Sequence, residues 1–580
     1  MLFYDFEVFK YDWLVVVIDT DKRKYHVVVN DVEALQELYI ANKKEIWVGY
    51  NSRHYDQYIF KAILCGLNPK KVNDFIIEQG RGGWEFSNLM HKIRFNNYDV
   101  MAGVDKGLKA LEGFMGNDIR ESSVPFNIDR KLTPEEIEAT IFYCTHDVEQ
   151  TIEVFMERMN DFEAQFDLLK AYNLPLSDIS KSQTQLSAKI LDAVKPTNER
   201  KDEFDIRVPD NLILGKYQYI ADWFLNPENH KYRVNPKNPK SKKHGLTAIV
   251  AGVEHDFAWG GLHGARKQYS GEGIYLNMDV GSLYPSLMIV YRLMSRNVSE
   301  AGFERFKEIY EKRLALKHAG KKKEQAPLKL VLNKTYGGMK DKHNPLYDPR
   351  QANLVCVYGQ LLLLDLIEKL ESVCEIIQSN TDGILVKLNN MDDYDLIDDI
   401  VFEWEQRTGL NLEFDEIISR IYQKDVNNYL TVDVDGKVKS KGSYVKELSR
   451  LDNDLPIVNE ALHAFMVHRI PVETTITRAN ELIKFQQVKK ISGKYDYMIH
   501  GEEILKERCV RVFASKMSNH GGLRKLHGTT KKFAKVESTP EHAFLWNDDI
   551  KNVHVDAVPQ LNKKWYIEMA QKRLKDFGVI

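Results

Sequence analysis

The stretch Asp279-Val280-Gly281-Ser282-Leu283-Tyr284-Pro285-Ser286 decides how this chain of 580 residues is interpreted. It follows a run of apolar and β-prone residues, 274–278, which predicts a buried strand that ends at Asp279. Gly281 permits a sharp turn, and Ser282 is suited to capping a helix that follows. A carboxylate at a strand end, beside free backbone N–H groups, can hold a divalent metal ion and a polyphosphate together. An ordinary strand–turn–helix junction with a capping Asp has the same pattern.

A second stretch, Lys329-Leu330-Val331-Leu332-Asn333-Lys334-Thr335-Tyr336-Gly337, places a cation and an amide at helical spacing. On a helix, Lys329, Asn333 and Tyr336 share one face. Gly337 and Gly338 are suited to ending that helix. A cation and an amide on one face suit a triphosphate, whereas a solvated lysine face is the ordinary alternative for any single Lys.

A third stretch, residues 373–388, has two β-like runs on either side of a tight turn. The turn residues 379–383 read Ser-Asn-Thr-Asp-Gly, a composition typical of a β-hairpin. Asp382 in this turn offers a second carboxylate from a separate strand. Asp279 and Asp382 together can therefore bridge a pair of hard cations such as Mg²⁺.

In this order, the three stretches resemble motifs A, B and C of the family B DNA polymerases. Motif C usually reads Y-x-D-T-D-S. Here Gln378, Asn380 and Gly383 replace the Tyr, the first Asp and the Ser, and only Thr381 and Asp382 are retained. In the family the second Asp is the more direct metal ligand. The departure therefore affects metal tuning and primer-end placement more than activity itself.

The resemblance implies DNA synthesis by two-metal phosphoryl transfer, with dNTP as substrate and two Mg²⁺ ions (Mn²⁺ as an alternative) in each site. The implied metal ligands are Asp279, Val280 and Asp382. The implied dNTP-binding residues are Ser282, Leu283, Tyr284, Arg313, Lys317, Lys329 and Asn333. The implied contacts with primer–template DNA are Tyr336, Gly337, Lys439, Lys441 and Gly442. The ring of Tyr284 would leave no room for a 2′-hydroxyl on the incoming sugar.

A further set of acidic residues lies near the N-terminus. Strand alternation in residues 2–8 puts Asp5 and Glu7 on one face, as a metal pair requires, although this spacing is common by accident. Thr133-Pro134-Glu135-Glu136 predicts a helix start with a capping box and Pro at the first position. Tyr143 and Asp147 lie four residues apart on that helix.

Together with Asn51-Ser52-Arg53-His54-Tyr55-Asp56, these residues resemble the Exo I, II and III motifs of the family's RNase H-like 3′–5′ proofreading domain. The resemblance implies that Asp5, Glu7, Asp56 and Asp147 hold two metal ions. It implies that Tyr143 orients the attacking water. Asn51 and Tyr55 would contact the frayed single-stranded primer end.

The overall composition does not indicate a nucleic-acid ligand, because the formal net charge is −3 rather than strongly positive. Basic residues must instead be concentrated in a cleft. Candidate clusters near the C-terminus are Lys489-Lys490, Arg524-Lys525, Lys531-Lys532 with Lys535, and Lys563-Lys564 beside Trp565-Tyr566. Each is equally well explained by a solvated face.

Five cysteines lie far apart with no C-x-x-C, which argues against a zinc site and for a reducing compartment. Neither a signal peptide nor a long apolar segment is visible. We therefore expect a cytoplasmic protein without membrane contact, in the infected host cell if the chain is phage-encoded.

The expected fold class is α/β and α+β, multidomain, with an RNase H-like exonuclease domain followed by a right-hand polymerase. The predicted boundaries are 1–170 (exonuclease), 171–245 (connecting segment), 246–300 (palm with motif A), 301–345 (fingers with motif B), 346–442 (palm with motif C) and 443–580 (thumb and C-terminal region). Since Asp5 starts the exonuclease at once, the extra N-terminal domain of larger members is expected to be missing.

We expect a monomeric replicative polymerase with proofreading, similar to compact bacteriophage replicases. Helicase, primase and single-strand-binding protein are its expected replisome partners. The short distances between motifs A, B and C disfavour protein priming. Two alternatives remain open: a replication subunit with a degenerate polymerase site, indicated by Asn380 and Gly383, and a nuclease whose polymerase half only clamps DNA.

Overall fold

The computed structural model describes residues 1–198 and 200–579, and the chain forms two compact units. The first unit comprises Met1–Ser182, Leu448–Ile457 and Ile476–Tyr566. The second unit comprises Gln183–Glu447, Val458–Thr475 and Ile567–Ile580. Each unit contains both sheets and helices, so the predicted mixed α/β, multidomain fold class is confirmed.

The N-terminal part of the first unit is built on a sheet of order β3-β2-β1-β4-β5. Its strands are β1 (Leu2–Val8), β2 (Trp13–Asp19), β3 (Lys24–Val29), β4 (Trp47–Gly49) and β5 (Asn97–Asp99). β1 and β2 are antiparallel, whereas β4 runs parallel to β1 and to β5. The helices of this part are α1 (Val32–Asn42), α2 (Asp56–Leu64), α3 (Pro69–Ile77), α4 (Leu108–Met115), α5 (Pro134–Glu157) and α6 (Met159–Ala171).

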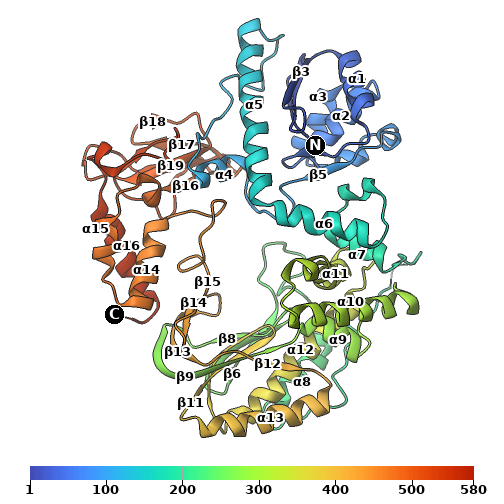
Figure 1. The fold of residues 1–580 in the computed structure, drawn as a ribbon, viewed down its shortest axis with the longest axis vertical. Helices are drawn as coiled ribbons and strands as arrows, with labels where there is room; N and C mark the ends of the chain where they lie inside the picture. The colour runs from blue at the N-terminus through green and yellow to red at the C-terminus, as the bar shows by residue number, and fades with distance from the viewer. Residues whose placement is uncertain (199, 580) are drawn as a thin grey trace. The chain divides into compact units, whose positions relative to one another are not determined.

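Alternation along β1 separates a core face from a polar face. Tyr4 and Phe6 are buried and pack edge-on against Phe60, and Tyr4 also packs against Trp47. The long helix α5 lies against β1 and β2, as Figure 1 shows beside the blue strands. Asp5 and Glu7, which alternate with Tyr4 and Phe6 along the strand, therefore lie on the face that is covered by α5.

The C-terminal part of the first unit consists of two small sheets. The first has the order β16-β19-β22, with strands β16 (Gln487–Lys490), β19 (Cys509–Ala514) and β22 (Ala543–Leu545). The second has the order β18-β17-β20-β21, with strands β17 (Tyr495–His500), β18 (Glu503–Ile504), β20 (Leu523–His527) and β21 (Phe533–Lys535).

One buried arginine joins the C-terminal part to α4 of the N-terminal part. Arg511 is fully buried, and its guanidinium donates hydrogen bonds to the carbonyl oxygens of Gly113 and Asn117. It also donates to the carbonyl oxygens of Trp546 and Asp548. A buried cation needs such partners, because each unmade bond costs about 1–3 kcal/mol or more. The C-terminal sheets are therefore a structural part of the first unit.

The second unit is organised around a larger antiparallel sheet of order β15-β14-β13-β9-β11-β10-β8-β7-β6, with β12 paired to β9. Its strands are β6 (Gly245–Val250), β7 (Val253–Ala258), β8 (His263–Ala265), β9 (Tyr269–Val280), β10 (Glu375–Asn380), β11 (Gly383–Leu388), β12 (Leu412–Phe414), β13 (Ile418–Asp425), β14 (Asn428–Asp433) and β15 (Val438–Lys441). β9 is central, with neighbours on both sides.

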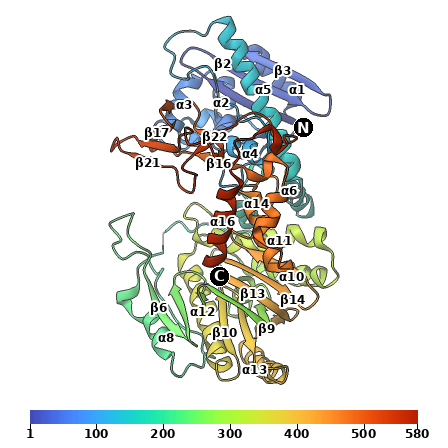
Figure 2. The same ribbon diagram turned by 90° about the vertical axis from the view of Figure 1, so that its left-hand side faces the viewer.

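Helices cover this sheet and project from it. They are α7 (Gln183–Ile190), α8 (Gln218–Leu225), α9 (Leu283–Val290), α10 (Glu300–His318), α11 (Lys322–Lys340), α12 (Pro349–Leu370), α13 (Asp392–Thr408), α14 (Pro456–His468), α15 (Val472–Arg478) and α16 (Lys563–Asp576), of which α14, α15 and α16 cross the boundary between the units. α12 is almost wholly buried and contacts β10, α9 and α13, and both views place it on the sheet (Figure 1, Figure 2). α10 and α11 pack against each other as a helical hairpin.

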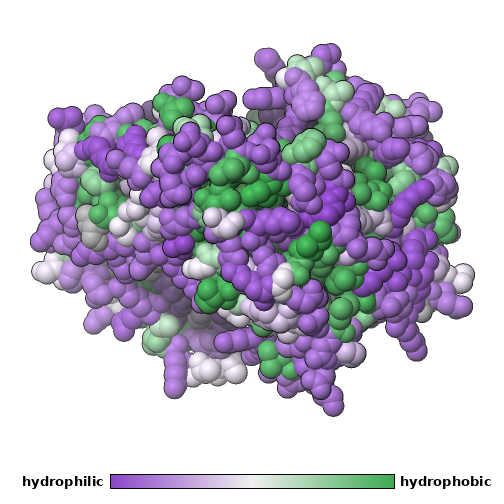
Figure 3. Space-filling model, turned by 90° about the horizontal axis from the view of Figure 1, so that it is seen from below, coloured by the Kyte–Doolittle hydropathy of each residue, from purple (hydrophilic) through white to green (hydrophobic). Residues whose placement is uncertain are grey.

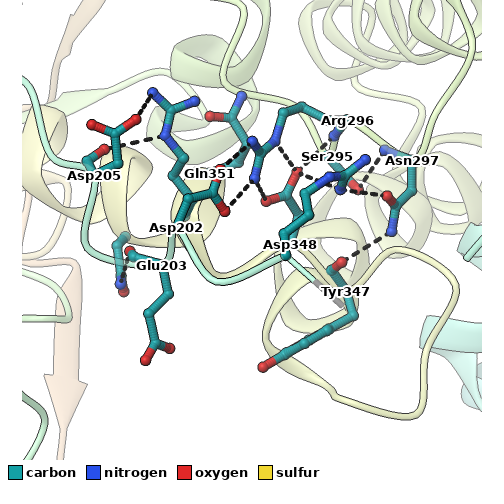
Figure 4. A network of polar contacts seen from close by, with 12 residues as sticks. Asp202, Glu203, Asp205, Ser295, Arg296, Asn297, Tyr347, Asp348 and Gln351 are labelled. Carbon is teal, nitrogen blue, oxygen red and sulfur yellow. Dashed lines mark hydrogen bonds and ion pairs between the residues drawn. The ribbon is translucent and has the colours of Figure 1, made fainter. Parts of the chain in front are cut away.

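A polar network fixes the segment that leads into α10 (Figure 4). The Arg296 guanidinium donates to both carboxylate oxygens of Asp348 and to Asp202. The Asn297 amide donates to the carbonyl oxygens of Pro345 and Tyr347. The Asp348 and Asp202 carboxylates raise the pKa of Arg296 above its ordinary value, so the guanidinium stays charged. The base of the helical hairpin is thereby held to the N-terminus of α12.

Hydrophilic side chains cover most of the face drawn in Figure 3, with hydrophobic patches among them. Within the described residues, every helix is either too short or too polar to cross a lipid bilayer. The five cysteines, all in the described part of the chain, are free.

Candidate active sites

The two carboxylates of motifs A and C meet at the ends of neighbouring strands. Asp279 is the second-last residue of β9, and Asp382 lies in the turn between β10 and β11. In the antiparallel β9–β11 ladder, Gly383 is paired with Asp279. The Val280 N–H donates to the carbonyl oxygen of Asp382 at 2.7 Å. Strand pairing thus brings together residues that are distant in the sequence.

Burial and like charge act on these carboxylates. Burial, together with the Asp382 and Asp415 carboxylates, raises the pKa of Asp279 to about 6. Burial also raises the pKa of Asp382, and the Lys441 ammonium partly opposes that rise. A site that gathers negative charge in a partly dry environment favours a divalent cation.

Two acidic residues of this site were missed by the sequence analysis. Glu413 is paired with Asp279 in the β12–β9 ladder, and Asp415 follows two residues later. The Asn277 amide donates to Asp279 at 2.9 Å and to Asp415 at 2.8 Å. The Lys439 ammonium donates to Asp415 at 2.7 Å. The signal that could have found them is the acidic residue pair two apart on a strand, the pattern used for Asp5 and Glu7.

Two glycines make room for the motif C turn. Thr381 has φ of 57°, in the left-handed region, and its N–H donates to the carbonyl oxygen of Leu262 at 2.7 Å. A Cβ at Gly261 would collide with the Thr381 side chain. A Cβ at Gly383 would collide with the Asp279 carboxylate. A side chain at position 383 would therefore have to displace the Asp279 carboxylate.

The expected phosphate ligands lie on the helical hairpin. Lys329 and Asn333 are both exposed on α11, one turn apart. Arg313 is buried on α10 and donates to the Ser282 hydroxyl. One turn later Lys317 is bound to the Glu413 carboxylate at 2.5 Å. All four side chains thus lie on the hairpin, where Lys329 and Asn333 face solvent and Arg313 and Lys317 have protein partners.

Two local expectations were wrong. Ser282 occupies the N-cap position of α9, but it has φ of 54° and its side chain makes no capping hydrogen bond. The helix that carries Lys329 and Asn333 does not end at Gly337 or Gly338, since α11 continues to Lys340. A Cβ at Gly338 would lie 2.9 Å from Leu346 Cδ1, so this glycine serves close packing rather than helix termination.

Tyr284 and Tyr336 form one aromatic cluster. Tyr284 follows the buried Leu283 at the start of α9, and its ring centroid lies 4.5 Å from that of Tyr336 on α11. The Tyr336 hydroxyl contacts the Cys356 thiol of α12 at 2.7 Å. The exposed Gly337 follows Tyr336. Cys356 had no sequence signal, because an isolated cysteine in an apolar helix has the pattern of an ordinary core residue.

The K-x-K-G element lies at the edge of the larger sheet. Lys439 and Lys441 are on β15, two residues apart and hence on one face, opposite Thr431 and Tyr429 of β14. Gly442 follows with φ of 95°, and a Cβ there would collide with the carbonyl oxygen of Asn427. This edge contributes two cations close to the carboxylates.

The Exo I and Exo II acids also lie together, in the first unit. Asp5 and Glu7 are on β1, as predicted. Asp56 begins α2 and accepts a hydrogen bond from the Phe6 N–H at 3.2 Å. Burial and the neighbouring carboxylates raise the pKa of Asp5 and Glu7 well above the ordinary range. Burial raises the pKa of Asp56 to about 7.

α5 supplies the Exo III residues. It begins with the predicted capping box, in which Thr133 accepts from the Glu136 N–H and Glu136 accepts from the Thr133 N–H. Asp147 points to the cluster from this helix, and burial raises its pKa to about 6. Tyr143 lies one turn earlier, and the Asp147 carboxylate is among the causes that raise its pKa.

Lys109 and Glu112 of α4 were not predicted. The Lys109 ammonium donates to Asp147 and, at 3.1 Å, to Glu112, and it lies 4.6 Å from the centre of the Tyr143 ring. Glu112 is fully buried, and His146 Nε2 lies 3.7 Å from its carboxylate. No spacing rule links α4 to α5, so the sequence offered no signal for this contact.

The two expected contacts with the primer strand flank the Exo II turn. Asn51 is exposed and has φ of 59°. Tyr55 is half-buried, and its hydroxyl donates to Asn73 of α3 at 2.8 Å. The groups of described His, Cys, Asp and Glu side chains close enough to share a metal ion are Asp5, Glu7 and Cys144, and Glu112, His146 and Asp147.

Comparisons with known proteins find few similarities in sequence. No protein-family model matches the chain. A curated protein named DNA polymerase 1, from Sulfurisphaera ohwakuensis, is 25% identical over 196 residues. That match covers 33% of this chain and spans only 21% of the relative's length. The solved structure of the family B DNA polymerase from the hyperthermophilic archaeon Pyrobaculum calidifontis aligns with a TM-score of 0.43 at 16% identity, over 100% of this chain and 78% of that one.

Proposed function

We propose that this chain, which is similar to the family B DNA polymerases, adds dNMP to a primer 3′ end under the direction of a template. The observation that carries the proposal is the meeting of Asp279 and Asp382 at the β9–β11 edge. The helix that follows Asp279, α9, packs against α11, which carries Lys329 and Asn333. Phosphoryl transfer needs little beyond such positioning and charge neutralisation.

The donor set fits Mg²⁺. Asp279 and Asp382 offer only oxygen atoms. The pKa of Asp279 is raised by burial and by its acidic neighbours, so a divalent cation would offset the cost of ionising this carboxyl group. Asp279, Asp382 and the Val280 carbonyl would hold two ions. When bound, these ions would activate the primer 3′-hydroxyl and stabilise the leaving pyrophosphate.

The side chains on the helical hairpin would bind the triphosphate. Lys329 and Asn333 are exposed for this purpose, and Arg313 would bind it beside Ser282. Lys317 would exchange its ion pair with Glu413 for a phosphate oxygen. Such an exchange is cheap, because an ion pair this exposed contributes only about 0–1 kcal/mol.

We further propose a 3′–5′ exonuclease in the first unit. Asp5, Glu7, Asp56 and Asp147 would hold its metal ions, again through oxygen. Tyr143 would orient the attacking water. Lys109 would hold Asp147 in place through the ion pair described above. Asn51 and Tyr55 would contact the frayed strand.

Within this proposal, residues 1–170 would form the exonuclease domain and 171–245 the connecting segment. Residues 246–300 and 346–442 would form the palm, 301–345 the fingers and 443–580 the thumb with the C-terminal region. We also propose that the chain is a monomeric, phage-type replicase that acts with helicase, primase and single-strand-binding protein.

Primer extension tests the proposal. Purified full-length protein, four dNTPs and Mg²⁺ should lengthen a labelled primer on a longer template strand. The same protein without dNTPs should shorten the primer from its 3′ end. Absence of extension with both Mg²⁺ and Mn²⁺ would reject the synthetic activity.

Asn380 favours a second candidate function, that of a replication subunit whose polymerase site is degenerate. Asn380 pairs with Gly383 in the hairpin and replaces the first acid of motif C. If the proposed polymerase is correct, Asn380→Asp should change metal preference or mismatch extension only modestly. An increase of several orders of magnitude in synthesis would favour the degenerate-site reading instead.

A further inference from the structure

The C-terminal sheet β18-β17-β20-β21 buries one face and exposes the other. Met498, Leu523 and Lys525 share the buried face by register, and all three are buried. Lys525 is paired there with Glu537 at 2.6 Å, so it is not available to a phosphate. The basic pair Arg524-Lys525, one of the candidate DNA-binding clusters of the sequence analysis, is therefore divided between the two faces of the sheet.

The exposed face combines aromatic, aliphatic and cationic side chains. Cross-strand partners share a face, so Ile504, Ile499, Arg524 and Lys535 form one row across the four strands. A second row follows two residues along, with Leu526 and Phe533 paired and Tyr497 beside them. We call six residues of these rows the exposed sheet face: Tyr497, Ile504, Arg524, Leu526, Phe533 and Lys535. Ile499, between Ile504 and Arg524 in the first row, is only 7% exposed and is not part of it.

Two rings and a guanidinium form its centre. The centroids of Tyr497 and Phe533 lie 6.4 Å apart, and the Arg524 guanidinium lies 5.7 Å from the Phe533 centroid. Phe533 is 48% exposed and Ile504 is 59% exposed. Flat, solvated π-surfaces beside a planar cation are what an unpaired base can stack on.

Charge and shape agree with an anionic strand as occupant. Residues 487–535 contain twelve lysines and arginines against four acidic residues, in a chain whose overall net charge is −3. Arg511 and Lys525 are buried, so ten of the twelve are left to contact an anionic strand. A hollow of about 390 Å³ lies at the end of the sheet, where Arg524 and Lys535 line it together with Glu502 and Glu541. Lys535 is paired with Glu541 at 2.7 Å, but this pair is exposed and contributes only about 0–1 kcal/mol, so a phosphate can replace the carboxylate. A Cβ at Gly521 would collide with Gly501, so the backbone there is closely packed.

We propose that the exposed sheet face binds single-stranded DNA, with unpaired bases stacked on Phe533 and Tyr497 and phosphates bound by Arg524 and neighbouring lysines. A duplex is a poorer occupant, because its base faces are covered by stacking. Binding here needs neither metal ions nor dNTP, so the site goes beyond the proposed synthesis and can be tested apart from it.

Photocrosslinking in EDTA is a direct test. A dT oligomer that carries 5-iododeoxyuridine should crosslink to Phe533 or Tyr497 of the full chain, as mapped by mass spectrometry. Phe533→Ala should lower the crosslink yield at this sheet at least about fivefold, since stacking contributes about 1–3 kcal/mol per base. Phe533→Trp should retain it. Phe402→Ala, which removes a more exposed ring on α13, is the control and should leave the yield unchanged.

Competition and salt separate stacking from simple charge. Unlabelled single strands should displace the crosslink, whereas an equal concentration of blunt duplex should not. Arg524→Gln should lower the slope of log K against log salt by about 0.7. Crosslinks that map only outside 495–535, a yield unchanged in Phe533→Ala, or equal displacement by duplex would each overturn the proposal. Tyr497→Leu provides the same comparison if Phe533→Ala does not fold.

Discussion

Gly383 is paired with Asp279 across strands β11 and β9, and a side chain at position 383 would occupy the space of the Asp279 carboxylate. Gly383→Ser restores the residue that motif C usually has. We nevertheless expect it to lower the single-turnover rate of primer extension, by up to about 100-fold, because small displacements of reacting groups have effects of that size. Gly493→Ser is the control, since a Cβ at that glycine meets no other atom within 4 Å. Unchanged or faster extension would contradict this reading of the site.

The two carboxylate clusters belong to different units, so their activities should be separable. Asp279→Ala or Asp382→Ala should reduce synthesis more than about 100-fold. Loss of a residue that only supports a metal ligand typically reduces activity by about 10–100-fold, so a larger loss would indicate a direct ligand. Digestion of single strands should persist in both variants. The double variant Asp5→Ala, Glu7→Ala should show the reverse. Loss of both activities from one substitution, in protein with an unchanged circular dichroism spectrum, would contradict the assignment.

The contact between Tyr284 and Tyr336 predicts how sugars are selected. Tyr284→Ala should open a void beside Tyr336 and raise incorporation of ribonucleotides relative to deoxyribonucleotides by about 10–100-fold. Tyr284→Phe keeps the ring and should leave the ratio unchanged. The ratio is measured as relative kcat/KM for each nucleotide. If Tyr284 is only a core aromatic, Tyr284→Ala will lower the melting temperature and leave the ratio as it was.

The raised pKa of Asp279 predicts a pH dependence of metal stabilisation. An unfolded Asp titrates near pH 3.9, whereas Asp279 in the folded protein titrates at about 6. Between these values the folded state holds a proton that the unfolded state has lost, so the metal-free protein loses stability as pH rises through this window. Metal ions bind the ionised form. The rise in melting temperature on adding Mg²⁺ should therefore be larger at pH 7.5 than at pH 5.

Asp279→Asn provides the comparison for that measurement. It removes the titrating group from the polymerase site but leaves the exonuclease acids, of which Asp56 titrates at about 7. The difference between the parent protein and Asp279→Asn isolates the contribution of the polymerase site. An equal Mg²⁺ effect at both pH values in the parent protein would count against the site.

Features set by neighbouring residues were predictable from the sequence. The strand that ends at Asp279, the hairpin that carries Asp382 and the capping box at Thr133 all depend on local chemistry, and all are present. Lys109 was missed because α4 reaches α5 through the fold rather than through the sequence. Asp415 offered a local signal, an acid two residues from Glu413, but the pairing of β12 with β9 that brings this segment to Asp279 could not be predicted from it. The end of α11 was wrong for a related reason, since Leu346 rather than helix termination accounts for Gly338.

The C-terminal region illustrates the same limit. Its basic clusters were visible, but whether each lysine faced solvent could not be read from spacing alone. Register in the β17–β20 pair turns Arg524 outward and Lys525 inward, although the two are adjacent in the sequence. Pairing partners that lie tens of residues away decide this orientation.

Arg511 has a consequence for how the protein is made. The carbonyl oxygens of Gly113 and Asn117 receive their guanidinium partner from a segment that begins at Ile476, roughly 290 residues after Ser182. At about 5–20 residues per second, the ribosome needs on the order of 15–60 s to synthesise that interval. During this time the nascent first unit waits with α4 uncovered while the second unit emerges. Completion of the first unit is thereby postponed until nearly the whole chain has been translated.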